Sequence, residues 1–234
     1  MNSVLTRQTY VPVVARLCLR NAIPEIEDAA RYLDDAVSAH ISNQPQLAGE
    51  LIAQANNPAM RKAIGEWADS LRGPKSPYNQ HRPVPGAPPK LNRAECLKPR
   101  MPSEEDKLRL IRRDGFHCRF CGIPVLRKEV RNCLISLYPS VIPWGTPFTI
   151  NHVALYAMDA QYDHLLPNSR GGSSELSNMV ITCNPCNYGR GEHSIEEMGL
   201  ADPRMREPIH SAWEGLERLL IYHERRSVSK ETLG

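Results

Sequence analysis

Apolar residues recur at helical spacing in three segments of the first 72 residues. In residues 24–41 they form one stripe along a helix, made of Ile26, Ala29, Ala30, Leu33, Val37 and Ile41. Residues 45–55 and 58–71 show shorter versions of the same pattern. Each begins with a proline, which the first turn of a helix accepts because the nitrogen there needs no partner within the helix. The pattern predicts a small helical domain over residues 1–72.

The helical pattern stops at residues 73–102, where eight of the chain's twenty prolines fall. Proline fixes its own φ and cannot donate a backbone hydrogen bond, so such a stretch stays out of helices and sheets. The composition predicts a semi-rigid linker or an extended arm that lies on a surface. It separates the helical segment from a second domain over residues 103–234.

Helical spacing returns in three segments of the second domain. Residues 103–115 begin with Ser103 as an N-cap before three acidic residues and end at Gly115, a sequence typical of a short helix. Residues 125–138 carry a second apolar stripe. Residues 208–224 carry a third, which predicts a C-terminal helix that packs back on the core.

Between these helices lies a pattern typical of a β-hairpin. Residues 160–166 and 178–182 alternate as strands do, and the glycine- and serine-rich residues 167–177 predict the loop between them. A short helix is expected from about Pro185. The second domain is therefore predicted to be α+β, with a hairpin and a following helix at its centre.

The formal net charge of +3 is too small to indicate nucleic-acid binding by itself. Residues 1–100 carry thirteen basic and nine acidic side chains, whereas residues 101–234 carry sixteen and seventeen. An electrostatic grip on DNA would therefore come from the N-terminal region or from a partner. Four basic residues are candidates for DNA contact, with solvated surface charge as the alternative: Arg16, Arg20, Arg61 and Lys62.

The chain has no apolar run of the ~20 residues that a membrane span needs, so we expect a cytoplasmic protein without a membrane partner. Its seven cysteines, an odd number, favour a reducing compartment over a disulfide framework. Three of them are expected to be buried thiols: Cys18, Cys96 and Cys133.

The other four cysteines form two CxxC pairs, Cys118 with Cys121 and Cys183 with Cys186. A CxxC turn places two thiolates on one side of a tight bend, and two such bends supply the tetrahedral sulfur shell that Zn²⁺ prefers. Four protein ligands leave no open position, so this zinc is predicted to be structural. Ordinary buried cysteines and a redox CxxC are the alternatives.

A composite motif runs through the same region: "RRDGFHCRFCG" at 112–122, "DHLLPNSRGG" at 163–172 and "NMVITCNPCN" at 178–187. His164 and Asn178 are fourteen residues apart, and Asn178 and Asn187 are nine apart. Over roughly residues 103–200 the chain resembles the HNH endonucleases, whose ββα-metal fold is a hairpin followed by a helix.

The resemblance implies a role for each matching residue. His164 would be the general base, Asp163 and Asn187 would bind Mg²⁺ or Mn²⁺, and Asn178 would hold the loop that orients His164. Arg190 could clamp a phosphate oxygen. The side-chain chemistry agrees, because an unperturbed histidine has a pKa of about 6.5 and hard cations prefer oxygen ligands.

Two features fit the resemblance less well. Residues 123–160 form an insertion longer than the family's usual spacing, read either as a substrate contact or as a packing unit. His193 lies six residues after Asn187, the wrong separation for one helix face, which leaves it a weak candidate for phosphate contact.

These features together predict a metal-dependent HNH endonuclease that hydrolyses DNA. We expect a nickase when it acts alone, with a protein partner or self-association through residues 1–72. A role as an effector of antiphage defence or restriction is one reading. The alternative function is a non-catalytic zinc module that binds nucleic acid or protein.

Overall fold

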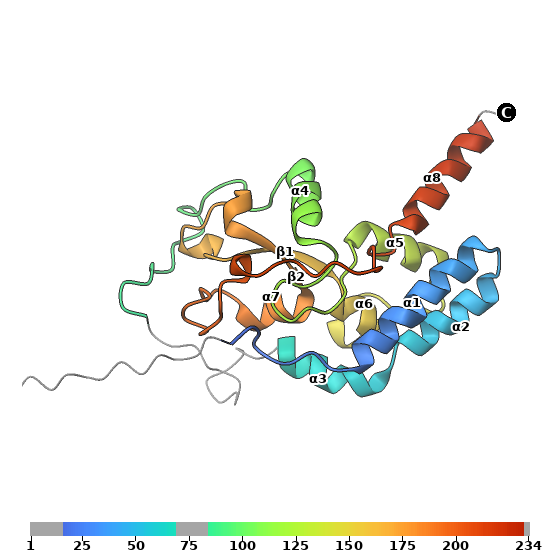
Figure 1. The fold of residues 1–234 in the computed structure, drawn as a ribbon, viewed down its shortest axis with the longest axis horizontal. Helices are drawn as coiled ribbons and strands as arrows, with labels where there is room; N and C mark the ends of the chain where they lie inside the picture. The colour runs from blue at the N-terminus through green and yellow to red at the C-terminus, as the bar shows by residue number, and fades with distance from the viewer. Residues whose placement is uncertain (1–15, 69–83, 232–234) are drawn as a thin grey trace, which may run out of the picture.

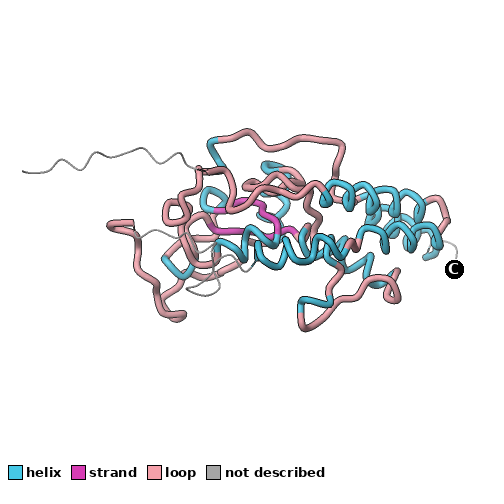
Figure 2. The backbone as a smooth tube through the Cα atoms, turned by 90° about the horizontal axis from the view of Figure 1, so that it is seen from below, coloured by secondary structure: helices cyan, strands magenta, loops and turns pink. Residues whose placement is uncertain are grey.

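The computed structural model describes residues 16–68 and 84–231. At its centre two short strands, β1 (Ala160–His164) and β2 (Met179–Cys183), pair in antiparallel register, with Ala160 opposite Cys183 and His164 opposite Met179. Helix α7 (Asn184–Arg190) follows β2 without a break (Figure 1). The predicted hairpin and helix are therefore present. The tube view shows the two strands enclosed by helices and loops (Figure 2).

Helix α4 (Glu104–Asp114) packs against β2 and has the ends that its sequence predicts. The Ser103 hydroxyl accepts a hydrogen bond from the Asp106 amide at 3.1 Å, and the chain turns at Gly115 with a φ of 72°. The Asp114 carboxylate accepts a hydrogen bond from the Ile181 amide at 2.9 Å. This bond ties the end of α4 to the middle of β2.

The predicted insertion contains helices α5 (Lys128–Leu137) and α6 (Val153–Ala157). Leu126, Val130, Leu134 and Val153 are buried, so much of this segment belongs to the core. In the described residues no helix is both long enough and apolar enough to cross a membrane.

The prediction of one helix over residues 208–224 is wrong in its first half. Helix α8 (Arg218–Glu231) begins only after a turn in which Gly215 and Leu216 both have positive φ. A Cβ on Gly215 would lie 2.2 Å from the Phe116 ring. The backbone here packs so closely on the ring that only glycine fits, and the chain turns instead of continuing as a helix. Trp213 donates its indole hydrogen to the Val125 carbonyl at 2.8 Å. Packing thus overrides the local helical pattern.

The N-terminal helices α1 (Glu25–Ile41), α2 (Pro45–Ala55) and α3 (Pro58–Ala68) occupy the predicted segments, and residues 69–71 lie outside the described residues. Helices α1 and α2 pack side by side, while α3 packs against α6 and α7 (Figure 1). The buried apolar residues of all three helices join those of the ββα unit in one cluster. These contacts do not show an independent N-terminal domain.

Residues 84–102 form an arm on the surface of the 167–174 loop, as one of the two readings of the proline-rich stretch predicts. The Leu91 amide donates to the Ser169 carbonyl at 2.7 Å, and Asn168 donates its side-chain amide to the Leu97 carbonyl at 3.0 Å. The Arg170 guanidinium donates to the Pro88 carbonyl at 2.7 Å.

His152 joins the N-terminal helices to the central unit. Its Nε2 lies 2.9 Å from the Ile52 carbonyl, and its Nδ1 accepts a hydrogen bond from the Leu155 amide at the start of α6. The neutral ring with its proton on Nε2 satisfies both contacts. The side chain is fully buried, and this burial lowers the pKa of His152 to about 4.

We expect acid to destabilise the fold through this residue. Because the folded-state pKa lies below the ordinary value, the neutral ring stabilises the fold above about pH 6.5, and this contribution is lost as the pH falls through about 4. A shift of this size corresponds to about 3 kcal/mol of unfolding free energy. Denaturant titrations at pH 7.5 and 4.5 should therefore show a smaller loss of stability for His152→Gln than for the parent. The exposed His210→Gln is the control; an equal loss in all three proteins would contradict the assignment.

Candidate functional site

The two CxxC pairs come together as predicted. The sulfur atoms of Cys118, Cys121, Cys183 and Cys186 all lie within 4.8 Å of one another. Gly122, with a φ of 82°, donates its amide to the Cys118 carbonyl and closes the first turn, while Cys183 caps the start of α7. Four sulfurs about 2.3 Å from a tetrahedral zinc lie about 3.8 Å apart, close to the 3.6 Å between Cys121 and Cys183. The donors therefore fit a metal such as zinc.

Asp163 and His164 end strand β1, at the end of the paired strands opposite to Cys183. The Asp163 carboxylate receives two hydrogen bonds from the Arg190 guanidinium, one of them 3.1 Å from Nε to Oδ2. Both side chains are buried, with Asp163 5% and Arg190 1% exposed. Burial raises the pKa of the Asp163 carboxyl, and the Arg190 charge offsets part of that rise.

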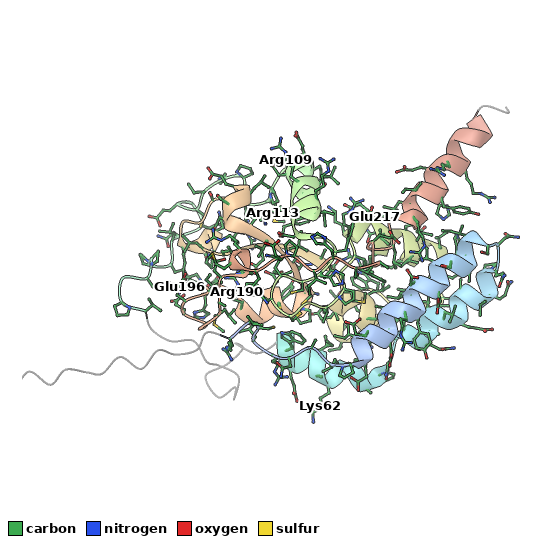
Figure 3. All side chains as sticks on the ribbon, viewed as in Figure 1. Lys62, Arg109, Arg113, Arg190, Glu196 and Glu217 are labelled. Atoms are coloured by element: carbon green, nitrogen blue, oxygen red, sulfur yellow. The ribbon has the colours of Figure 1, made fainter. Side chains whose placement is uncertain are left out.

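Arg190 is therefore enclosed in the protein (Figure 3). Besides Asp163 it donates to the carbonyls of His164 and His193. A side chain with this burial and these partners holds α7 to the end of β1. It does not present its charge to a phosphate in this arrangement, contrary to the clamp that the sequence suggested.

His164 is also covered, with 7% of its surface exposed. Its Nε2 lies 3.0 Å from the Ser174 hydroxyl, which in turn contacts the carbonyls of Pro99 and Arg100 on the arm at 2.9 and 2.7 Å. Burial, followed by the charges of Arg100 and Arg190, lowers the pKa of His164 to about 4. The ring is therefore neutral at physiological pH, as a proton acceptor must be.

Asn178 ties the loop that follows β1. Its side-chain oxygen accepts from the Leu166 amide at 2.9 Å, and its nitrogen donates to the carbonyls of Leu166 and Ser173 at 3.0 and 2.8 Å. These three bonds cross the loop between the two strands. They fix the backbone just after His164.

Asn187 lies on α7, which packs against β1, and its side chain is half-buried. In the part of the chain that the structure describes, its amide has no hydrogen-bond partner. The Asp163 oxygens keep lone pairs beyond those that Arg190 uses, so a carboxylate and an amide oxygen remain for a hard cation. Oxygen donors are the ligands that Mg²⁺ and Mn²⁺ prefer, and Arg190 places a competing positive charge on Asp163. His193 is the other residue that the sequence suggested for phosphate contact. Its Nδ1 lies 3.7 Å from the Oε2 of Glu197.

Gly172, the second of the two adjacent glycines in the loop, is required for a steric reason. A Cβ on Gly172 would lie 1.8 Å from the Leu166 carbonyl oxygen and 2.8 Å from the Asn178 amide nitrogen. Only a residue without a side chain allows the loop to close on Asn178.

Gly172→Ala should therefore destabilise the protein by more than about 2 kcal/mol, since backbone and not a flexible side chain must move. Gly65→Ala in α3 is the matched control, because a Cβ there meets nothing within 4 Å and alanine favours a helix by about 1 kcal/mol. Denaturation midpoints measure both. Equal midpoints for the two variants would show that the loop adapts.

The sequence did not predict the parts of the site that lie far apart along the chain. Ser174 and Arg100 carry no motif, and only the folded arm brings them to His164. The four basic candidates for DNA contact have different surroundings. Arg20 pairs with Glu66 at 3.3 Å, Arg61 binds the carbonyls of Thr149 and Asn151, and Arg16 binds that of Met198, whereas Lys62 points outward (Figure 3). At least three of them hold the fold together.

Residues 149–199 match a protein-family model described as HNH endonuclease. The matched segment contains β1, the tied loop, β2, α7 and the second CxxC pair. No curated protein and no solved structure matches the chain. The family suggests nuclease activity on nucleic acid.

Proposed function

We propose that this chain, which the HNH endonuclease family matches over residues 149–199, is a metal-dependent endonuclease that hydrolyses DNA phosphodiester bonds. The observation that carries the proposal is the position of His164 within the matched hairpin and helix. His164 is neutral, it ends β1 next to Asp163, and α7 with Asn187 packs against that strand. In this proposal the base and the carboxylate of β1 and the amide of α7 act together on one phosphate.

In this proposal His164 takes the proton of the attacking water. A ring that is neutral at pH 7 can accept the proton, and the loop bonds of Asn178 keep its backbone in place. Asp163 and Asn187 would hold Mg²⁺ or Mn²⁺, which when bound supplies positive charge to the phosphate and to the leaving oxygen. Arg190 positions Asp163 through its two hydrogen bonds.

The arm sets a condition on this activity. Pro99 and Arg100 lie against Ser174, and Ser174 lies against His164, so a phosphate reaches the ring only after residues 97–100 move. The isolated protein should therefore be a weak enzyme. The same covered site favours the second candidate function, a zinc module that binds without cleaving. An assay of DNA cleavage distinguishes this module from the endonuclease.

Supercoiled plasmid with Mg²⁺ or Mn²⁺ tests both points. We expect slow conversion to the open-circular form before any linear product, because one ββα site presents one histidine to one strand. Replacing residues 97–100 by a Gly-Ser stretch of equal length should speed nicking about tenfold, since a flexible arm loses more entropy when it covers the site. A gain of this size corresponds to about 1.4 kcal/mol.

Arg100→Ala is the control that separates loss of charge from loss of cover. If the variant with the replaced arm nicks plasmid at the same rate as the parent, the arm is no obstacle. Direct conversion to linear plasmid by a monomer would contradict the one-strand proposal. No cleavage by either protein would favour the non-catalytic module.

The physiological role goes beyond the site. We propose that α1–α3 and the segments around them dock a protein partner or a second copy of the chain. Residues 101–234, which contain the ββα unit, have almost no net charge with which to hold DNA. An antiphage or restriction effector that acts with a partner fits this arrangement. Deleting the helices would not test it, since they share the core of the ββα unit.

A further inference from the structure

A fifth cysteine lies beside the thiol cluster. Residues 16–23 run past the cluster before α1 begins, and they are anchored on both sides of Cys18. On one side Arg16 exchanges backbone hydrogen bonds with Gly199 and Ala201 at 3.1 and 2.9 Å. On the other side Arg20 pairs with Glu66 on α3. Cys18 is thereby held over the metal-binding turns although it is a hundred residues from the nearest of them.

The Cys18 thiol touches two of the four sulfurs. Its sulfur lies 3.4 Å from the Cys186 sulfur, and Cys121, which lines the same pocket, is its other neighbour in the cluster. In the described structure it makes no such contact with Cys118 or Cys183. Cys18 therefore lies outside the edge of the tetrahedron that Cys121 and Cys186 form, at about the separation that two zinc ligands keep from each other.

The cluster has room for movement on this side. A pocket of about 360 Å³ opens there, lined by Cys18, Cys118 and Cys121 together with residues of both flanking segments. Cys121 is half-buried, whereas the other three ligands are buried. Cys121 lines the pocket and is more exposed than the other three ligands, so it is the one that can leave most easily.

We propose that Cys18 is a reserve ligand of the zinc centre, able to take the position of Cys121 or Cys186 but not that of Cys118 or Cys183. In the exchange a bond forms between zinc and the Cys18 sulfur as the bond to the departing cysteine breaks. The Cys18 thiol gives its proton to water and the departing thiolate takes one up, so no electron is transferred. The metal centre would then also fasten the N-terminal segment. This inference rests on the cluster and not on nuclease activity.

Cobalt provides the test, because Co²⁺ bound in place of zinc absorbs in the near ultraviolet in proportion to its cysteine ligands. We expect Cys18→Ser and Cys121→Ser each to keep the absorption of the parent with four thiolates. The double variant should lose roughly a quarter of it, since three thiolates remain of the four that a tetrahedral site takes. Cys118→Ser should lose that quarter even with Cys18 present, and Cys133→Ser, outside the cluster, should lose nothing.

Competition with a chromophoric chelator gives a second measurement on the same proteins. Cys18→Ser should weaken zinc binding at least tenfold in the Cys121→Ser background and leave it unchanged in the parent. Equal absorption and equal zinc affinity for Cys121→Ser and the double variant would overturn the proposal. So would a Cys121→Ser protein that binds no metal or fails to fold, because Cys18 is expected to rescue it.

Discussion

His164→Ala is expected to abolish DNA cleavage, with a fall in rate of about 10²–10⁴-fold, while the protein stays folded and keeps its zinc. A general base contributes this factor in the transition state, and within residues 16–68 and 84–231 the ring hydrogen-bonds to one side chain, that of Ser174. The rate of plasmid nicking measures the loss, and thermal denaturation with elemental analysis checks the fold and the metal. The exposed His210→Ala should cut at the parental rate.

Substitutions of Asn187 and Asp163 distinguish the role of the general base from that of the proposed Mg²⁺ ligands. Asn187→Ala should lose activity through weaker ion binding, and added Mg²⁺ or Mn²⁺ should restore part of it. Asp163→Ala should lose stability as well, because it leaves the buried Arg190 guanidinium without its carboxylate, a change that costs about 3–5 kcal/mol. If all three variants cut as fast as the parent, the site lies elsewhere.

Removal of zinc should unfold the ββα unit. Structural zinc contributes apparent binding free energies of about 10–16 kcal/mol in small zinc-binding peptides, as much as the whole stability of a typical domain. The cluster joins the turn after α4 to the start of α7, so its loss frees both ends of the unit. We expect one zinc per chain in the parent by elemental analysis, and loss of amide protection over residues 103–200 after chelation.

The Cys118→Ser, Cys183→Ser double variant should reproduce the effect of chelation, because it removes one ligand from each turn and neither vacancy faces Cys18. Cys133→Ser is the control for removal of a thiol outside the cluster. Folded and active parent protein that contains no zinc would contradict a structural role for the metal.

The sequence alone was sufficient where the determining contacts are local. Ser103 and Gly115 mark the ends of α4 because capping depends on residues within one turn of the helix end. The two CxxC turns and the spacing from His164 to Asn187 specified a hairpin, a helix and a sulfur cluster, since short segments with such turns have few ways to pair. The family match over residues 149–199 covers much of this locally determined part.

Only the tertiary structure decided the surroundings of those residues. Arg190 became a buried partner of Asp163, the arm came to cover His164, and Cys18 came to lie beside Cys186. No sequence pattern predicts these contacts. Hydrophobic periodicity reports on residues within one helix or strand, whereas each of these contacts joins different segments of the chain. The start of α8 shows the same limit. Close packing of Gly215 on Phe116 forces a turn where the apolar spacing alone predicts helix, and a contact across ninety-nine residues outweighs a local preference of a few tenths of a kcal/mol per residue.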